Sequence, residues 1–454
     1  MNKSDKNSII EIIMPGLSLF SRERKVIFVD YTVQEVLRFV GDNDVKFVKL
    51  AFCDIYGRLK NLNIFADELP VAFSRGMAFN AKGIDGYTGT KQDEIFLKPD
   101  PATLNVLPWR PHEGCVARLL CDLVKYDGTP FEGDTRYILK DAVAKLKELG
   151  YGCDISSSSE FYLFKTDELG NPTHIPQDYA GYLDASPLDK GENVRRDICL
   201  TLEEMEIIPK TSHHERGPGQ NEVDFRKNYA LSAADDMNTF RYVVKTIAER
   251  NGLYASFMPK PLENCNGSAQ HLGFMLTQNG INIMKNADGS ISDTAMSFMC
   301  GILRRVREIC IFSNPIANSY ERFGSGEAPA AIGYAIDNHS TLMRINQEVG
   351  KEAKIVLRSP DGSSNQYITI ALLLYAGIEG IEEKLTEKDV NIGQKLPMSL
   401  KEAIDIAADS EFIKRHIDKT IIDNYISQKT AEWEKYSKSG GDKQELFNKQ
   451  FLTL

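Results

Sequence analysis

A Gly-Pro-Gly sequence at residues 217–219 separates two segments that carry chemically active side chains. His213, His214 and Glu215 precede it, and Glu222 follows it. Side chains alternate along a straight strand, so residues seven apart would point to opposite faces. A tight turn at the glycines reverses the chain and lets both glutamates face one pocket. Converging carboxylates repel each other unless a cation lies between them, so the segment predicts a hairpin with a metal site. A hairpin whose charges are simply solvated is the alternative.

The composition favours a soluble globular chain. Its 454 residues leave room for roughly two to three domains, and no apolar run reaches the roughly 18 residues of a membrane span. The N-terminus lacks the apolar core and cleavage motif of a signal peptide. The net charge of −10 and the lack of a dense Lys/Arg cluster argue against nucleic-acid binding. The eight cysteines are scattered, so we expect reduced thiols and a cytoplasmic protein.

Strand and helix signals are mixed without a regular βαβ rhythm. Residues 45–52 alternate between polar and apolar, 54–57 have turn character, and 59–64 return, which predicts a hairpin in a β-rich N-terminal domain. A further strand is expected at residues 157–164. Apolar spacing and stop signals predict helices at residues 134–149, 193–205, 230–251, 295–312 and 367–385. This mixture favours an α+β fold.

More polar segments accompany the hairpin in a fixed order. They cover residues 158–162, 193–197, 258–271, 319–329, 338–344, 358–367 and 396–400. Taken together, they resemble the glutamine synthetase family, type I, over about residues 40–435. The resemblance implies a small β-grasp domain, expected at residues 25–125, and an α+β catalytic domain at 126–454, after an N-terminal extension at 1–24. It also implies a homo-oligomer of two stacked hexameric rings, with active sites between neighbouring subunits.

The resemblance assigns one metal site to three carboxylates, Glu160, Glu215 and Glu222. Oxygen ligands from separate strands suit Mg²⁺ or Mn²⁺. In the family, a second metal ion holds the ATP phosphates. Two of its glutamate ligands are replaced here by Ser158 and Val356, so only His271 remains as a metal ligand there. One neutral imidazole binds a hard divalent cation poorly.

Other positions on the ATP side also differ from the family pattern. Gly273 and Met275 stand where the family has a histidine and a serine, and His339 stands where it has a phosphate-contacting arginine. Asn80 replaces an aspartate that helps to bind ammonium. Because most differences lie on the ATP side, the sequence predicts a divergent member with one metal ion and makes ATP use doubtful.

The glutamate side of the pattern is retained. The substrate-binding residues implied by the resemblance are Gly267, Asn266, Arg322, Arg344 and Arg358. A guanidinium group suits a carboxylate in both geometry and charge. Glu327 matches a loop glutamate that shields the site and handles the ammonium proton, although its spacing from Arg322 is one residue shorter than usual. The expected catalytic residues are therefore Glu327, Arg322 and Arg358.

These observations leave three functions open, each with a small carboxylate or amide as the ligand. The favoured one is ATP-independent hydrolysis or transfer of glutamine or a γ-glutamyl amide. One metal ion would activate the carbonyl or a water, and Glu327 would act as the general acid or base. An ATP-dependent ligase joining glutamate to ammonia or an amine is the first alternative. A non-catalytic ring-forming or regulatory protein is the second.

Overall fold

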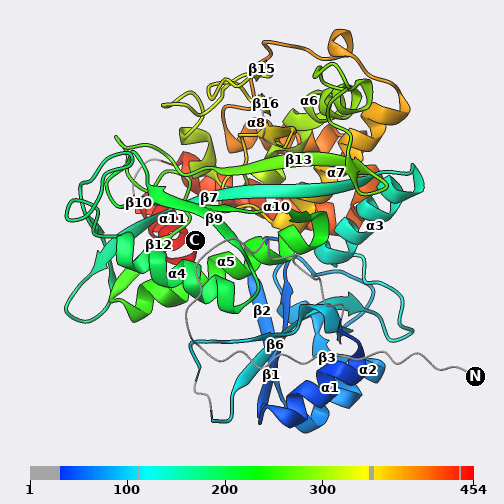
Figure 1. Cartoon of the computed structure of the whole chain (residues 1–454), viewed down its shortest axis with the longest axis vertical. Helices are drawn as coiled ribbons and strands as arrows, with labels where there is room; N and C mark the ends of the chain where they lie inside the picture. The colour runs from blue at the N-terminus through cyan, green and yellow to red at the C-terminus, as the bar shows by residue number, and fades with distance from the viewer. Residues whose placement is uncertain (1–30, 111–112, 347–351, 439–440) are drawn as a thin grey trace, which may run out of the picture.

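The structure is a computed structural model, and it describes residues 31–110, 113–346, 352–438 and 441–454. In this part of the chain, the strands form a smaller and a larger sheet, with most helices beside the larger one (Figure 1). The expected N-terminal extension lies outside the described residues. The two sheets and long helices confirm the expected α+β fold.

The N-terminal part of the chain builds the smaller sheet. Its strands are β1 (Phe47–Cys53), β2 (Leu59–Phe65), β3 (Met77–Asn80), β4 (Glu94–Pro99), β5 (Asn105–Val106) and β6 (Val116–Val124). They run in the order β2-β1-β6-β4-β3, with β5 beside β6. The antiparallel pairing of β1 with β2 confirms the predicted hairpin. Helices α1 (Val33–Asp42) and α2 (Leu69–Arg75) belong to the same part, and a capping box between Thr32 and Glu35 begins α1.

The larger sheet carries the predicted hairpin. Its strands are β7 (Gly152–Thr166), β8 (Pro172–Pro176), β9 (Pro209–His214), β10 (Gln220–Phe225), β11 (Asn228–Tyr229), β12 (Leu253–Ser256), β13 (Gln270–Gln278), β14 (Ile281–Asn282), β15 (Tyr334–Ile336), β16 (Met343–Asn346) and β17 (Lys354–Leu357). The main order is β15-β16-β17-β13-β7-β10-β9. The 15-residue β7 pairs with β8, β10, β11, β12 and β13, so it holds the sheet together.

Further helices pack against this sheet, and two of them contact the same face of it, through Phe240 against Phe161 of β7 and Phe298 against Phe274 of β13. These helices are α3 (Thr135–Glu148), α4 (Glu192–Glu204), α5 (Ala230–Arg250), α6 (Asp293–Ser313), α7 (Gln366–Glu382), α8 (Leu400–Asp409), α9 (Glu411–His416), α10 (Lys419–Ser437) and α11 (Gly441–Thr453). Short 3₁₀ helices cover Ala66–Glu68, Ala81–Gly83, Pro101–Thr103, Ala317–Glu321 and Glu387–Asp389. In Figure 1, β7 and β13 cross the middle of the molecule, α4 and α5 lie below them, and α6 and α8 lie above. All five predicted helices are present.

Glycines allow α6 and α7 to pack closely. A Cβ at Gly301 of α6 would overlap the carbonyl oxygen of Ala376, and one at Gly380 of α7 would overlap that of Ser297. The first residues of α7 also join the two parts of the protein. Asn365 caps α7, and its Nδ2 donates to the carbonyl of Asp54 at 3.0 Å.

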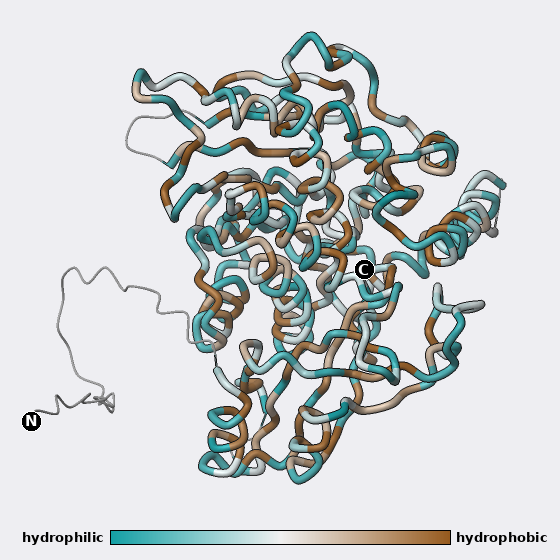
Figure 2. The backbone as a smooth tube through the Cα atoms, turned by 90° about the vertical axis from the view of Figure 1, so that its right-hand side faces the viewer, coloured by the Kyte–Doolittle hydropathy of each residue, from teal (hydrophilic) through white to brown (hydrophobic). Residues whose placement is uncertain are grey.

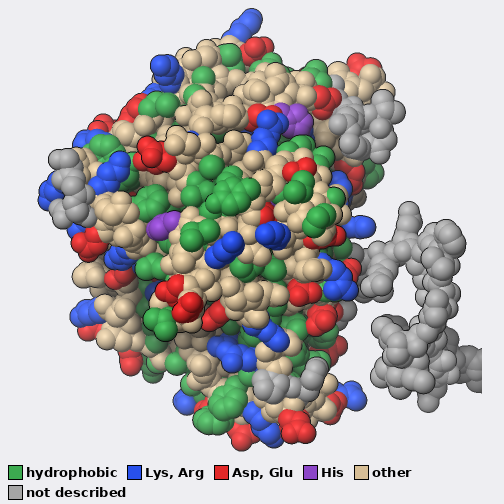
Figure 3. Space-filling model, turned by 90° about the vertical axis from the view of Figure 1, so that its left-hand side faces the viewer, with side chains coloured by type: hydrophobic (Ala, Val, Ile, Leu, Met, Phe, Trp, Pro, Cys, Tyr) green, Lys and Arg blue, Asp and Glu red, His purple; other side chains and the backbone are tan. Residues whose placement is uncertain are grey.

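Figure 2 shows brown hydrophobic segments where strands and helices pack, and teal segments mainly in loops. One continuous hydrophobic cluster reaches from the smaller sheet through α6 and α7. On the face drawn in Figure 3, cationic and anionic side chains are interspersed, and hydrophobic ones gather near its middle. All eight cysteines are free thiols. Within the described residues, no helix is long and apolar enough to cross a membrane.

Candidate active site

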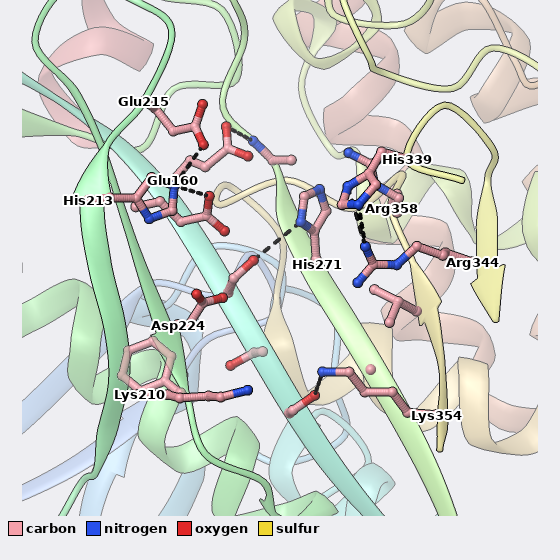
Figure 4. A pocket seen from close by; sticks show the side chains of 18 of the residues that line it. Glu160, Lys210, His213, Glu215, Asp224, His271, His339, Arg344, Lys354 and Arg358 are labelled. Atoms are coloured by element: carbon pink, nitrogen blue, oxygen red, sulfur yellow. Dashed lines mark hydrogen bonds and ion pairs between the residues drawn. The ribbon is translucent and has the colours of Figure 1, made fainter. Parts of the chain in front are cut away.

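Polar side chains align across neighbouring strands of the larger sheet. Glu160 on β7 lies opposite Glu222 on β10, and Ser158 on β7 lies opposite Asp224 on β10 and His271 on β13. Residues two apart on a strand point the same way, so these side chains share one face. They line a cavity of about 1250 Å³, seen from close by in Figure 4. The carboxylates lie mainly on one side of the view, and His339, Arg344, Arg358 and Lys354 lie on the other.

The hairpin between β9 and β10 has the predicted form. The Glu215 N–H donates to the Gln220 carbonyl at 2.8 Å, and the Gln220 N–H donates to the Gly217 carbonyl at 2.9 Å. Residue 217 needs to be glycine, because a Cβ there would overlap the Tyr162 hydroxyl. Glu215 and Glu222 consequently line the same cavity, as the turn predicted.

A buried clasp holds this hairpin in place. Asp178 Oδ1 accepts hydrogen bonds from His214 Nε2 at 2.9 Å and from the Gly219 N–H at 3.0 Å. The neighbouring Asp189 is paired with Arg195 at 3.1 Å. Although Asp178, Asp189 and His214 could in principle surround an ion, these protein contacts already engage them. We therefore interpret this cluster as structural support for Glu215.

His213 joins the two hairpin carboxylates. Its Nε2 lies 3.0 Å from Glu215 Oε1 and 3.5 Å from Glu222 Oε2. His213 is absent from the site residues predicted from the sequence. Its position directly opposite Glu222 in the hairpin register is the signal that could have indicated it.

Three crowded carboxylates create strong repulsion in the cavity. Burial, followed by the charge of Glu215, raises the pKa of Glu160 to about 8. Burial and then the charge of Glu160 raise the pKa of Glu222 well above its usual range. Burial acts to raise the pKa of Glu215 as well, but hydrogen bonds, chiefly from His213, outweigh it and lower that pKa. A divalent cation would offset the repulsion, so these oxygen ligands fit Mg²⁺ or Mn²⁺.

The possible metal ligands form two overlapping groups that share Glu222. One group is Glu160, Glu222 and His271, and the other is His213, Glu215 and Glu222; in each, the ligand atoms lie within 4.8 Å of one another. Ser158 Oγ lies 3.2 Å from His271 Nδ1, so Nε2 is the ring nitrogen left to meet an ion. The four predicted metal ligands are thus brought together, with His213 added.

The predicted substrate residues Gly267 and Arg322 lie against each other. A Cβ at Gly267 would come within 2.6 Å of Arg322 Cγ, so glycine lets the arginine pass close to the backbone. Arg322 is buried and donates to the carbonyls of Ser359 and Pro360, while its Nε has no partner among the described residues. Asn266 also lines the cavity, with its carbonyl engaged by the Tyr162 hydroxyl.

Glu327 lies on a loop at the rim of the same cavity. Its Oε1 accepts a hydrogen bond from Arg216 at 2.7 Å, and its Oε2 lies 3.7 Å from Arg358 NH2. Arg358 NH1 has no partner in the described part of the chain, although that atom is buried. The shortened spacing before Glu327 therefore still lets this carboxylate reach the cavity. The contact between Arg216 and Glu327 was not predicted from the sequence.

Arg344 and His339 lie on the cationic side of the cavity. Arg344 NH1 donates to His339 Nε2 at 2.7 Å, which requires that nitrogen to be unprotonated. Burial, followed by the charge of Arg344, lowers the pKa of His339, in keeping with a neutral imidazole. No described carboxylate forms an ion pair with Arg344, and its Nε is buried without a partner. No described residue therefore neutralises this guanidinium, which can meet an anion in the cavity.

Lys354 adds a positive charge that was not predicted. Its Nζ donates to Ser156 Oγ at 2.8 Å, and among the described residues no carboxylate lies within ion-pair distance. Burial, then Lys210 and Arg344, lower the pKa of Lys354 to about 8. A Cβ at Gly273 would lie 3.0 Å from Lys354 Cδ and 2.5 Å from Ser156 Oγ. The glycine that stands in place of the family's histidine therefore gives Lys354 its room.

The remaining predicted differences occupy separate places. Val356 is buried on β17 opposite Gly273 and Arg344, where its apolar side chain offers no metal ligand. Met275 lies further along β13 and lines the cavity. Asn80 lies at the end of β3 in the smaller sheet, where its Oδ1 accepts from the Lys82 N–H at 3.0 Å.

Comparisons with known proteins decide the family. The glutamine synthetase catalytic domain matches residues 132–445, and the glutamine synthetase beta-Grasp domain matches residues 44–126. The chain belongs to the glutamine synthetase family. A glutamine synthetase of Clostridium saccharobutylicum is 41% identical over 424 residues, covering 89% of this chain and 96% of that protein. One of Methanosarcina mazei is 41% identical over 423 residues, covering 89% and 95%.

A more distant relative and a solved structure agree with this assignment. A Staphylococcus aureus glutamine synthetase is 37% identical over 425 residues, covering 89% of this chain and 95% of that protein. The cryo-EM structure of Plasmodium falciparum glutamine synthetase has a TM-score of 0.82 at 21% identity and covers 91% of this chain and 98% of its own. That likeness concerns the fold, and it confirms the expected β-grasp domain followed by an α+β catalytic domain.

The relatives also correct two expectations. The favoured function, an ATP-independent hydrolase or transferase, is wrong, because relatives at 37–41% identity over most of the chain are named as enzymes that synthesise glutamine. The expectation of a divergent member with doubtful ATP use has no support for the same reason. Its physical weakness was to judge the ATP side position by position, from replacements such as Ser158, Val356 and His339. The cavity holds other groups there, including Lys354 and Arg344.

Proposed function

We propose that this chain is a glutamine synthetase, an ATP-dependent ligase that joins ammonia to the γ-carboxyl group of glutamate. The main support is the set of relatives named for this synthesis, at 37–41% identity and over 89% of the chain. The cavity supports the same function, because one side crowds carboxylates and histidines, while Arg344 and Lys354 on the other side have no ion-pair partner among the described residues. ATP-dependent ligation needs both a metal site and positive charge for phosphate.

The reaction has two balanced steps. A γ-carboxylate oxygen of glutamate attacks the terminal phosphorus of ATP, and the bond from that phosphorus to ADP breaks. Ammonia then attacks the activated carbonyl carbon, and phosphate leaves with the oxygen that came from glutamate. The ammonium ion must first lose a proton, and Glu327 at the rim is the carboxylate placed to accept it.

Arg322 and Arg358 are the proposed partners of the glutamate carboxylates. Each has a buried guanidinium nitrogen without a partner in the described residues, so each can donate to a ligand without breaking an existing bond. Gly267 lets its backbone lie close to the Arg322 side chain. Asn266 lines the same end of the cavity.

Mg²⁺ or Mn²⁺ is the proposed cofactor. Glu160, Glu215 and Glu222 would hold it, with His271 and His213 as further ligands at the edges of the group. When bound, such an ion neutralises the crowded carboxylates and polarises the substrate oxygen that it contacts. The Ser158 contact fixes the orientation of His271, and the Asp178 clasp steadies the hairpin that carries Glu215.

Lys354 and Arg344 are the proposed partners of the ATP phosphates. They lie on the side of the cavity opposite the carboxylates, as Figure 4 shows, and Arg344 and Lys354 lack an ion-pair partner among the described residues. Transfer of a phosphoryl group depends mainly on positioned positive charge. These cations provide charge where Ser158 and Val356 provide no metal ligand.

The test uses the purified full-length chain with glutamate, ammonium, ATP and Mg²⁺ or Mn²⁺. We expect glutamine and phosphate to form in equal amounts, and neither product without ATP or after chelation of the metal. Glutamine breakdown without ATP, or phosphate release that does not depend on glutamate, would contradict the proposal. Glu327→Gln should retain the fold and lose most of the synthetic rate.

We further propose a homo-oligomer, with stacked hexameric rings as the expected arrangement. Large apolar side chains are exposed on the loop beside the hairpin, including Tyr179, Leu183 and Leu188. Exposed apolar side chains of this size commonly mark a protein interface. Mass measurement of the intact protein in solution tests the stoichiometry, and a monomer would refute it.

A further inference from the structure

Arg216 lies at the turn of the metal-site hairpin and reaches across the rim of the cavity. Its NH2 donates to Glu327 Oε1 at 2.7 Å, and its guanidinium carbon lies 5.6 Å from the centre of the Tyr182 ring. The Arg216 and Glu327 side chains are 52% and 41% exposed, so water and small solutes reach the pair. The contact joins the hairpin to the loop that carries the proposed proton acceptor.

Two guanidinium groups lie next to Glu327. Besides Arg216 at 2.7 Å, Arg358 NH2 lies 3.7 Å from the other carboxylate oxygen. Asn80, which stands at the family's ammonium-binding aspartate, brings no negative charge to this function. A cation that approaches Glu327 therefore meets a carboxylate already bonded to one guanidinium and close to another.

We propose that Arg216 competes with ammonium for Glu327 and makes the site discriminate against nitrogen donors that carry a positive charge. This inference rests on the proposed function, because it assigns the ammonium proton to Glu327. Ammonium that donates to Glu327 must share Oε1 with Arg216 or displace it, and the guanidinium charge repels the approaching ammonium ion. A neutral donor, such as hydroxylamine near neutral pH, attacks without needing to pair with the carboxylate first.

A different role for Arg216 makes the opposite prediction. If the ion pair served only to hold the loop over the cavity, its loss would raise KM for every nitrogen donor and lower kcat. Competition predicts instead that loss of Arg216 strengthens the binding of ammonium and of no other substrate. The direction of the change in KM for ammonium therefore separates the two roles.

The experiment compares Arg216→Ala with the wild type and with Arg216→Lys, which keeps the positive charge. Exposed ion pairs contribute about 0.2–1 kcal/mol, and about 1.4 kcal/mol corresponds to tenfold in binding. We expect Arg216→Ala to lower KM for ammonium by about 1.5- to 5-fold, with KM for hydroxylamine and for glutamate within about twofold. Arg216→Lys should resemble the wild type. An unchanged or raised KM for ammonium in Arg216→Ala would overturn the proposal.

A binding measurement keeps this test separate from turnover. Line broadening of ¹⁵N-labelled ammonium, recorded without ATP, reports its binding to the full-length protein. Tighter binding to Arg216→Ala than to the wild type supports competition even if no glutamine forms, and in that case only the proposed function fails. Equal or weaker binding refutes competition. Arg196→Ala is the matched control, because Arg196 is an exposed arginine whose weak ion pair, 3.6 Å from Asp197, lies on α4.

Discussion

Replacement of Lys354 by methionine should weaken ATP binding strongly while preserving the fold. Methionine has a similar length, and the change removes one hydrogen bond to Ser156 and a positive charge without a described carboxylate partner. Two opposite charges 4 Å apart at an effective dielectric of 20 interact by about 4 kcal/mol, which is an upper bound in this solvent-filled cavity. A hydrogen bond to a charged group typically contributes about 1.5–3 kcal/mol. At about 1.4 kcal/mol per tenfold change, the expected loss in affinity is about 10- to 150-fold.

The charge of Lys354 also predicts how ATP binding depends on pH. Its pKa is lowered to about 8. Lys354 is therefore charged in most molecules at pH 7 and neutral in most molecules at pH 9. Phosphate binds the charged form, so affinity should fall as the pH rises through about 8. The wild-type loss between pH 7 and pH 9 should reach about tenfold. Lys354→Arg keeps its charge throughout and should show a much smaller loss.

The assay is calorimetric titration with a non-hydrolysable ATP analogue and Mn²⁺ at both pH values. Lys227→Met is the matched control. Lys227 lines the same cavity but is already paired with Glu352 at 2.6 Å and Asp154 at 3.4 Å, so its loss should change affinity less than about twofold. If Lys354→Met binds the analogue within twofold of the wild type at pH 7, the assignment of Lys354 to the phosphates is refuted.

Three further predictions concern the metal, the fold and pH. Glu222→Gln should lower Mn²⁺ affinity by about 10- to 100-fold in calorimetry, because two ligand groups share this carboxylate; unchanged affinity would exclude it as a ligand. Gly301→Ala should lower Tm, since its Cβ overlaps the Ala376 carbonyl and overpacking costs about 1–3 kcal/mol. Gly83→Ala, with open space around it, should not lower Tm. Burial raises the pKa of Asp236 to about 7, so its contribution to stability is lost as the pH rises through 7. The change in Tm caused by Asp236→Asn should therefore be more favourable at pH 8 than at pH 5. An equal change in Tm at both pH values would contradict this sign.

Local chemistry made parts of the site predictable from sequence. The glycines at 217 and 219 demand a turn, and the turn determines that Glu215 and Glu222 approach each other. Glu160 followed from the resemblance, and the strand register places it opposite Glu222. Helix positions were also predictable, because each long helix has its own apolar spacing and a local start or stop signal.

Contacts between distant strands were not predictable in the same way. Lys354 reaches Ser156 across Gly273, and each of these residues lies on a different strand. Comparison of single positions with the family pattern registers Gly273 as a loss, whereas the sheet shows the space being used by a lysine. Arg216 likewise meets Glu327 only because the hairpin turn and the loop approach each other in three dimensions. The error about ATP arose from this difference.

The transfer of oxygen from glutamate to phosphate tests the proposed ligase most directly. The purified chain would be given glutamate labelled with ¹⁸O in its γ-carboxyl group, together with ammonium, ATP and Mg²⁺. Synthesis through an activated carboxylate predicts one ¹⁸O atom in each phosphate released with glutamine, measured by mass spectrometry. Phosphate without the label, or breakdown of glutamine without ATP, would contradict the account.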